Sequence, residues 1–462
     1  MGLFSKPRQA EWRHTHFFEL RDALEKEGCA LCRLNLASVA HRLDGLAYED
    51  VNDPGLRDQL RASRGFCAHH AWQFARLRSA AQGVAIIYRD VLTEVARILV
   101  EGPTHPHGLF AAHRRKASLP SRLLPQAPCP ICAGLSETDG HYLGTLIDHL
   151  DEEDFSAVYR RSDGLCLPHL SRALDHLTSV EIRRVLFDTA RRYLYALLAS
   201  CNENVDGCTR RLAESLVGVQ GALVQVDSLI LAARNPEGLE GEKAIEELLP
   251  TGGADGCPVC HQVQGTGDRV LAGLPSDGYP SFPSLCNLHA WRFVKLVDHQ
   301  STAGRFRREL RDAIGQLTTV SADANSQDGS SPPFPEEWHV CPVEGPLTDL
   351  EVSSARHLVK ALSLPVIQSA FRRSSGLCLP HLIQALRCGD QAGAEILAQL
   401  EADRIQDLVV DLSKYIRKQD YRFRDEPWGK ELRSPWRAVS LAVGAEGLRG
   451  VGAIWWPRRK HR

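Results

Sequence analysis

Cysteine, histidine and one glutamate recur along this chain at spacings that suit metal binding. Four times, a Cys-x-x-Cys pair or a variant of it is followed by a Cys-x-x-His motif. The sets in sequence order are Cys29, Cys32, Cys67 and His70; Cys129, Cys132, Cys166 and His169; Cys257, Cys260, Cys286 and His289; and Cys341, Glu344, Cys378 and His381. Each set offers four ligands, so the sequence predicts one metal site per set, although neighbouring sets could also exchange their pairs.

The ligand types favour zinc. Three thiolates and one imidazole are a common ligand set of closed, structural zinc sites. An iron–sulfur cluster is the alternative, because thiolates suit both, but clusters more often have only cysteine ligands. A thioredoxin-like redox motif would need a βαβ context, which the sequence does not indicate.

The fourth set differs from the others because Glu344 stands where the second thiol would be. A carboxylate carries the same charge as a thiolate but binds zinc less well. This set is therefore expected either to hold a metal still or to have lost it and to pack as an ordinary turn.

Residues near the ligands suggest local geometry. Glycine precedes the third thiol by two positions in three sets, at Gly65, Gly164 and Gly376, as a turn with positive φ would require. Trp72 and Trp291 follow their histidines by two positions and are expected to cap the sites with apolar surface. Three further cysteines are predicted to be buried or surface thiols without a role, namely Cys201, Cys208 and Cys388.

Two kinds of motif alternate along the chain. RRSDGLCLPHL at 160–170 and RRSSGLCLPHL at 372–382 agree at ten of eleven positions. CAHHAWQF at 67–74 resembles CNLHAWRF at 286–293 in the same way. The chain therefore reads as an A–B pair of modules that has been duplicated in tandem.

The predicted fold is all-α, with tandem helical modules. Each module is pinned by a metal that its Cys-x-x-Cys and Cys-x-x-His turns bind, and we call these turns knuckles. Apolar residues follow the knuckles in helical steps, for example from Leu77 to Ile98 and from Ile405 to Tyr415. Proline-, glycine- and serine-rich stretches mark the module boundaries. We predict module A1 at 1–115, B1 at 116–234, A2 at 235–325, and B2 with its altered site and tail at 326–462.

Composition and charge disfavour a nucleic-acid-binding, a secreted or a membrane-spanning protein. The 462 residues carry a formal net charge of −2, which disfavours a general nucleic-acid-binding surface. No signal peptide or apolar run of membrane-spanning length is visible, so a cytoplasmic, reducing location is expected, where Cys-x-x-Cys pairs are more often metal ligands than disulfides. The C-terminal WWPRRKHR, from Trp455, could touch an anionic surface, although a frayed tail is the simpler interpretation.

Two segments resemble a known family. Leu31–Trp72 and Lys418–Gly429 are similar to an uncharacterised bacterial family, a domain of unknown function with a CPxC pair followed by a GFCxxH motif. The resemblance implies metal binding but brings no established activity. The chain departs from the family pattern at Ala30, in place of proline, and at Glu344.

Three functions remain open at this point. The first is a non-catalytic, zinc-pinned scaffold or adaptor with a protein partner. The second is an electron-transfer or redox protein with one iron–sulfur cluster per complete set, and the third, disfavoured by charge, is a nucleic-acid-associated zinc protein. The sequence contains no Walker loop, GxSxG or HExxH motif, and no catalytic residue is predicted.

Overall fold

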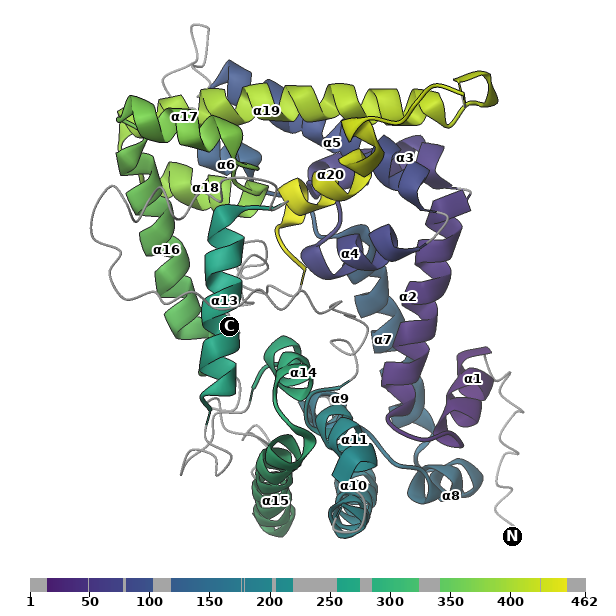
Figure 1. Cartoon of the computed structure of the whole chain (residues 1–462). Coiled ribbons are helices and arrows are strands. Elements are labelled where there is room, and N and C mark those ends of the chain that lie inside the picture. The colour runs from purple at the N-terminus through teal and green to yellow at the C-terminus, as the bar shows by residue number, and fades with distance from the viewer. Residues whose placement is uncertain are drawn as a thin grey trace, which may run out of the picture. The chain divides into compact units, whose positions relative to one another are not determined.

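The computed structural model describes residues 15–48, 50–77, 80–102, 118–175, 177, 179–201, 205–218, 256–274, 285–323, 341–423 and 425–446. Every regular element in these ranges is a helix, which confirms the predicted all-α fold (Figure 1). Within the same ranges, no helix combines the length and the apolar character that crossing a membrane requires. The tail from Trp455 lies outside the described residues.

The chain divides into two compact units, and neither is contiguous in sequence. Unit 1 comprises Met1–Ser38, Leu135–Gln220 and Pro275–His339, and unit 2 comprises Val39–Gly134, Gly221–Leu274 and Val340–Arg462. The division falls inside two long helices, α2 (Ala30–Tyr48) and α7 (Pro130–His149). The predicted module boundaries near 115, 235 and 325 lie outside the described residues, so they stay predictions.

Unit 1 is a group of helices that pack against one another. Besides parts of α2 and α7, it contains α1 (Thr15–Leu24), α8 (Glu153–Arg161), α9 (Leu167–Asp175), α10 (Val180–Ser200), α11 (Val205–Val217), α14 (Asn287–Leu296) and α15 (His299–Asp323). Helix α11 packs against α10, α14 and α15 (Figure 1). Leu186 on α10 and Leu310 on α15 are completely buried, as the apolar stripes on those helices predict.

Unit 2 is built on a pair of long helices that lie side by side, α5 (Ala81–Glu101) and α19 (Gln391–Lys418) (Figure 1). The other helices of unit 2 are α3 (Pro54–Ala62), α4 (Ala68–Arg76), α6 (Leu119–Leu123), α13 (Pro258–Ala272), α16 (Glu344–Ala361), α17 (Pro365–Arg373), α18 (Leu379–Cys388) and α20 (Ser434–Val443), with short 3-10 turns at Asp50–Asn52, Tyr421–Phe423 and Lys430–Arg433. Helix α20 packs on both α5 and α19.

The stripe predicted from Leu77 to Ile98 lies on one helix except for its first residue. Helix α4 ends at Arg76, where Leu77 turns to an extended conformation with ψ of 124°, and α5 begins at Ala81. From Val84 to Ile98 the predicted apolar positions are buried on α5. The break separates the short helix that carries the knuckle from the long helix that carries the core.

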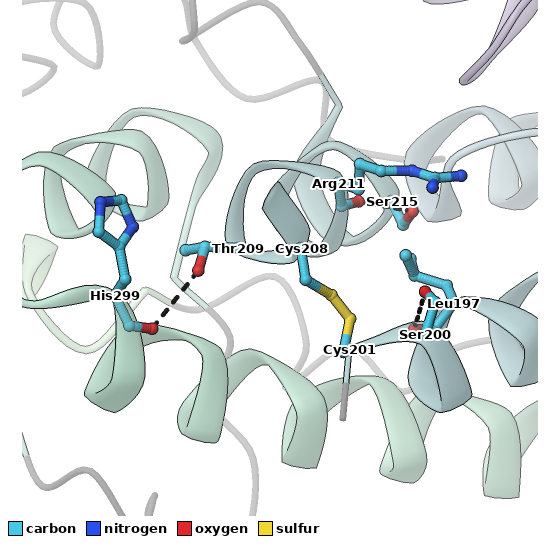
Figure 2. The surroundings of a disulfide bond; sticks show 8 residues. All are labelled: Leu197, Ser200, Cys201, Cys208, Thr209, Arg211, Ser215 and His299. Carbon is cyan, nitrogen blue, oxygen red and sulfur yellow. Dashed lines mark hydrogen bonds between the residues drawn. A yellow bond between two sulfur atoms is a disulfide. The ribbon is translucent and has the colours of Figure 1, made fainter. Parts of the chain in front are cut away.

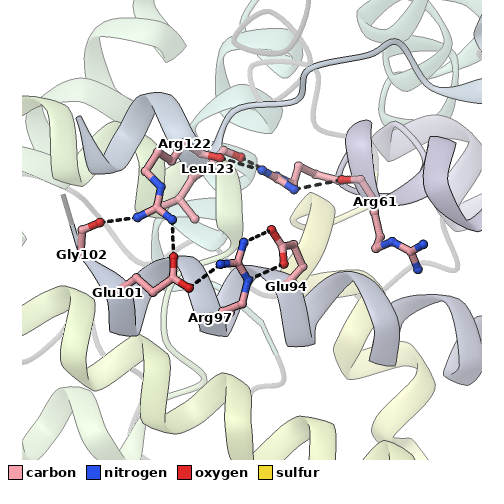
Figure 3. Close-up of polar contacts among 8 residues, drawn as sticks. Arg61, Glu94, Arg97, Glu101, Gly102, Arg122 and Leu123 are labelled. Atoms are coloured by element: carbon pink, nitrogen blue, oxygen red, sulfur yellow. Dashed lines mark hydrogen bonds and ion pairs between the residues drawn. The ribbon is translucent and has the colours of Figure 1, made fainter. Parts of the chain in front are cut away.

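Charged side chains attach the short helix α6 to the end of α5 (Figure 3). Arg122 on α6 bonds Glu101 and the carbonyl of Gly102, while Arg97 pairs with the same Glu101. Arg64 donates to the carbonyls of Arg122 and Leu123 at 2.6 and 3.2 Å. These bonds hold the chain within unit 2 shortly before it reaches Cys129.

Candidate metal centres

Each Cys-x-x-His motif lies at the start of a helix, and this local geometry orients its two ligands. Cys67, Cys286 and Cys378 are N-cap residues, and the histidine three positions later lies in the first helical turn. The i, i+3 spacing places both side chains on one side of the helix end. The distance from Sγ to histidine Nδ1 is accordingly 3.1–3.2 Å in all four Cys-x-x-His motifs.

The Cys-x-x-Cys pairs also lie at helix starts, which the sequence analysis did not predict. Cys29, Cys129 and Cys257 immediately precede α2, α7 and α13, and their partner thiols lie in the first turn. Unpaired N–H groups and the helix dipole favour negative charge at such ends. Where a pair meets a Cys-x-x-His motif, two helix N-termini therefore stabilise the thiolates of one centre.

Site 1 consists of Cys29, Cys32, Cys166 and His169, and all four belong to unit 1. The sulfurs of Cys32 and Cys166 lie 3.6 Å apart, and His169 Nδ1 lies 3.4 Å from the sulfurs of both Cys29 and Cys32. One small central ion could contact all four atoms. Helices α2 and α9 supply the ligands.

Site 2 consists of Cys67, His70, Cys129 and Cys132, and all four belong to unit 2. Cys67 and Cys132 are 3.6 Å apart at their sulfurs, and His70 Nδ1 lies 3.3 Å from the sulfur of Cys132 and 3.7 Å from that of Cys129. Here the ligands come from α4 and α7. His69, the adjacent histidine, is not in the group, and burial lowers the pKa of its side chain to about 4.

Site 3 consists of Cys257, Cys260, Cys378 and His381, also within unit 2. Its sulfur–sulfur distance, between Cys260 and Cys378, is again 3.6 Å, and His381 Nδ1 lies 3.4 Å from the sulfurs of Cys257 and Cys260. Sites 1 and 3 are counterparts in the repeat, because both join a Cys-x-x-Cys helix to a CLPH helix.

The remaining four predicted ligands form two pairs in different units. Cys286 and His289 begin α14 in unit 1, whereas Cys341 and Glu344 lie at the start of α16 in unit 2. The Glu344 amide donates to the Cys341 carbonyl at 3.1 Å, whereas in the complete pairs the first cysteine's carbonyl accepts from the residue four positions later, so this turn is tighter.

The structure corrects the grouping in sequence order. Each Cys-x-x-Cys pair of sites 1 to 3 meets the Cys-x-x-His motif of a different set from its own. In the first half of the chain, α2 runs on for 16 residues after Cys32, roughly 24 Å at 1.5 Å per residue, and a 3-10 turn and α3 follow before α4 begins.

Around site 1, an acidic residue that the sequence analysis missed supports the histidine. Asp139 on α7 is 2% exposed, and its Oδ1 lies 3.0 Å from His169 Nε2. Asn35 and Arg172 donate to the same carboxylate. Such a contact keeps the proton on Nε2 and leaves Nδ1 free to bind a metal.

At site 3 an acidic side chain, Glu351, lies near the histidine in the equivalent place but makes no hydrogen bond to it. Glu351 Oε1 lies 3.7 Å from His381 Nε2, and both residues are buried. Asp139 and Glu351 each stand ten positions after the first ligand of their helix, Cys129 and Cys341. An acidic residue at this repeated position was the signal that could have identified them.

We expect Asp139→Ala to weaken metal binding at site 1 by about 10- to 100-fold, because the imidazole loses the group that fixes its orientation and proton. Competition with a chelator would measure the change. Glu137→Ala, on the exposed side of the same helix, is the control. Equal affinities in the two variants would contradict the role of Asp139.

Without a metal, charge within site 1 is unevenly shared. Burial opposes ionisation of Cys29, but hydrogen bonds from Cys166 and Cys32 and the charge of His169 lower its pKa well below the usual thiol value. Burial, together with the neighbouring thiolate, raises the pKa of Cys166 well above that value. Burial lowers the pKa of His169, but the Cys29 thiolate outweighs it and raises the pKa to about 10.

Metal binding at site 1 should therefore release protons. The hydrogen bond from Cys166 lowers the pKa of Cys32, yet contact with Cys29 and burial raise it overall. At neutral pH, Cys32, Cys166 and His169 would each lose one proton to an incoming ion, while Cys29 is already ionised. Because protons compete with the metal, affinity should rise with pH through the neutral range.

Calorimetry in two buffers of different ionisation enthalpy would count the released protons. We expect between two and three per ion, averaged over the sites. An affinity independent of pH between 6 and 8 would contradict this distribution of charge.

Other local predictions have mixed outcomes. The glycines before the third thiol do adopt positive φ, with 93° at Gly65 and 72° at both Gly164 and Gly376. The tryptophan side chains are fixed by hydrogen bonds. The indole Nε1 of Trp72 donates to the Gly444 carbonyl at 3.1 Å, and that of Trp291 donates to the Gly218 carbonyl at 2.8 Å.

Of the three cysteines outside the sets, two were wrongly predicted to be single thiols. Cys201, at the end of α10, and Cys208, on α11, form a disulfide that joins these helices (Figure 2). Cys388 is a free, partly buried thiol whose sulfur contacts the carbonyls of Ala385 and Val352.

Comparison with known proteins agrees with the resemblance found in the sequence. Residues 14–203, which include every ligand of sites 1 and 2, match a family of unknown function, DUF6062. A relative in Caldicellulosiruptor sp. (strain Rt8B.4), an "uncharacterized 23.9 kDa protein in xynA 3'region", is 25% identical over 165 residues, which cover 35% of this chain and 73% of the relative. No solved structure matches.

Proposed function

We propose that the protein is a non-catalytic helical scaffold, and that structural zinc ions at sites 1, 2 and 3 stabilise each compact unit from within. The observation that carries the proposal is the repeated ligand group, in which three thiols and one imidazole lie within 4.8 Å of one another. The pairs Cys286–His289 and Cys341–Glu344 are left out of this count, because neither unit contains both.

Ligand spacing supports a single ion over a cluster. With Zn–S bonds of about 2.3 Å, a tetrahedral zinc ion places its sulfurs about 3.8 Å apart. The sulfur–sulfur distances of 3.6 Å at sites 1 to 3 are close to this value. An iron–sulfur cluster binds its ligands through several irons and spreads them more widely, so the redox alternative has less support.

A structural role has more support than a catalytic one. Catalytic zinc sites keep one position open for water or substrate, whereas structural sites have four protein ligands. Each of sites 1 to 3 offers four. The ligands of one site come from positions far apart in the chain, such as Cys29 and Cys166, so an ion there would close a long loop and contribute directly to folding.

The helical surface would then serve a partner. Exposed aromatic residues are present in unit 2, where Tyr421 is 79% exposed, Trp428 40% and Trp436 43%. Aromatic side chains are enriched at protein interfaces. With the net charge of −2, this favours a protein partner over nucleic acid, and we propose an adaptor role in the cytoplasm.

Purification without air, followed by metal analysis and an absorption spectrum, tests the proposal. We expect a colourless protein with about three zinc ions per chain, in line with its three complete groups. A brown protein with several irons per chain would replace the scaffold by the electron-transfer alternative. A protein whose thiols bind neither metal would overturn both.

A further inference from the structure

Each compact unit contains helices from both halves of the duplicated chain. We call residues 1–234 repeat 1 and residues 235–462 repeat 2. In unit 1, α14 and α15 of repeat 2 pack against α11 of repeat 1, and α15 also packs against α10. In unit 2, α4 and α5 of repeat 1 pack against α20 of repeat 2, and α5 also packs against α19 (Figure 1).

These two contacts are equivalent. Helix α4 begins with CAHHAWQF and α14 with CNLHAWRF, so α4–α5 and α14–α15 are the same segment of the two repeats. In the same way, α10–α11 follows RRSDGLCLPHL, and α19–α20 follows RRSSGLCLPHL. The same packing therefore occurs once in each unit, and each time it joins different repeats.

Polar contacts at the two joints match as well. In unit 2, Trp72 donates to the carbonyl of Gly444. In unit 1, Trp291 donates to the carbonyl of Gly218, and Asn287 Nδ2 donates to the same carbonyl at 3.1 Å. The helices α11 and α20 end just before these glycines, which have φ of 75° and 85°.

A second contact links unit 1 helices of different repeats. The Thr209 hydroxyl on α11 donates to the carbonyl of His299 on α15 at 3.4 Å, next to the disulfide of Cys201 and Cys208 (Figure 2).

The two backbone turns to which the tryptophans bond lie against metal centres. A Cβ atom on Gly218 would lie 3.4 Å from the sulfur of Cys32 and 3.7 Å from that of Cys166, so the backbone of this turn lies against site 1. In unit 2 the amide of Ala445 donates to the sulfur of Cys260 at 3.4 Å, so the turn after Gly444 lies against site 3.

We propose that the two repeats are obligate partners which exchange the α4–α5 and α14–α15 segments, and that each repeat thereby closes the metal centre of the other. Trp72 of repeat 1 holds the turn over site 3 of repeat 2, and Trp291 of repeat 2 holds the turn over site 1 of repeat 1. The partner that one repeat requires is a second copy of the repeat, which this chain supplies itself. The closure, but not the exchange, rests on the proposed zinc.

Amide hydrogen exchange, measured on the full chain, tests whether the two repeats swap these segments. The result does not depend on whether a metal is bound. Ile98 on α5 and Leu317 on α15 are equivalent, buried positions. Ile98→Ala should raise amide exchange in α19 and α20 by at least about tenfold, because their core partner is truncated. Leu317→Ala should raise it in α10 and α11 instead.

Faster exchange confined to helices of the mutated repeat would overturn the proposal. If Ile98→Ala does not fold, Ile98→Val removes less volume and should show the same pattern with a smaller increase.

Zinc release tests the closure. After a chelator is added, mass spectrometry of alkylated thiols reports which cysteines become accessible. Trp72→Phe lacks the indole N–H and should accelerate labelling of Cys260 severalfold while leaving Cys32 unchanged, and Trp291→Phe should do the reverse. Unchanged labelling of both thiols would overturn the closure alone. A protein that never binds zinc would overturn the proposed function but leave the hydrogen-exchange result intact.

Discussion

Replacing Cys166 by serine is expected to remove one zinc ion per chain and to unfold or strongly loosen the part of unit 1 around α9. Cys166 is 3% exposed and belongs to site 1, where it faces the Cys32 thiol across the centre. A structural zinc ion contributes on the order of 10 kcal/mol to folding, so the loss of one ligand should cost several kcal/mol. Metal analysis and thermal unfolding would measure the two effects.

Cys388→Ser is the matched control, since Cys388 is a free cysteine outside the three groups. We expect its metal content and unfolding temperature to equal those of the unchanged protein. If Cys166→Ser also keeps both values, the assignment of Cys166 as a ligand is wrong.

The second large effect separates the two possible groupings of ligands. In the structure, Cys29 shares site 1 with Cys166, whereas Cys67 belongs to site 2. Cys29→Ser combined with Cys166→Ser should therefore cost one zinc ion per chain, because both changes damage the same centre. Cys29→Ser combined with Cys67→Ser should cost two, because the changes damage separate centres.

Grouping in sequence order predicts the reverse, since it places Cys29 and Cys67 in one set. The equivalent pair in repeat 2, Cys257→Ser with Cys378→Ser, should again cost a single ion, because both belong to site 3. Metal counts by mass spectrometry of the native protein would decide between the groupings. A loss of two ions in the Cys29–Cys166 double variant would contradict the exchanged arrangement.

The types and spacing of the ligands could be predicted from sequence because they depend on local geometry. A cysteine at an N-cap and a histidine three positions later meet on one helical turn, whatever the rest of the chain does. Cys378 and His381, 3.1 Å apart from sulfur to nitrogen, are an example. The positive φ of Gly164 and the helical stripe on α10 are local for the same reason.

The pairing of motifs, by contrast, depends on distances between segments that are remote in sequence. Packing in unit 1 brings Cys32 to Cys166, whereas Cys67 belongs to site 2 in unit 2. Asp139 follows the same rule, because its contact with His169 joins two different helices. The disulfide between Cys201 and Cys208 went unpredicted although its residues are near in sequence, because a reducing location was expected and the cysteines lie outside the motifs.

By itself, the sequence predicted that this protein is helical, that its motifs repeat, and that its Cys and His residues could hold a metal, because helix starts, repeats and i, i+3 spacing are local properties. Only the tertiary structure decided which ligands share a centre and which repeat completes which unit. Identical local motifs are compatible with either pairing, and the choice of Cys166 rather than Cys67 as a partner for Cys29 follows from the packing that buries the apolar helix faces of unit 1.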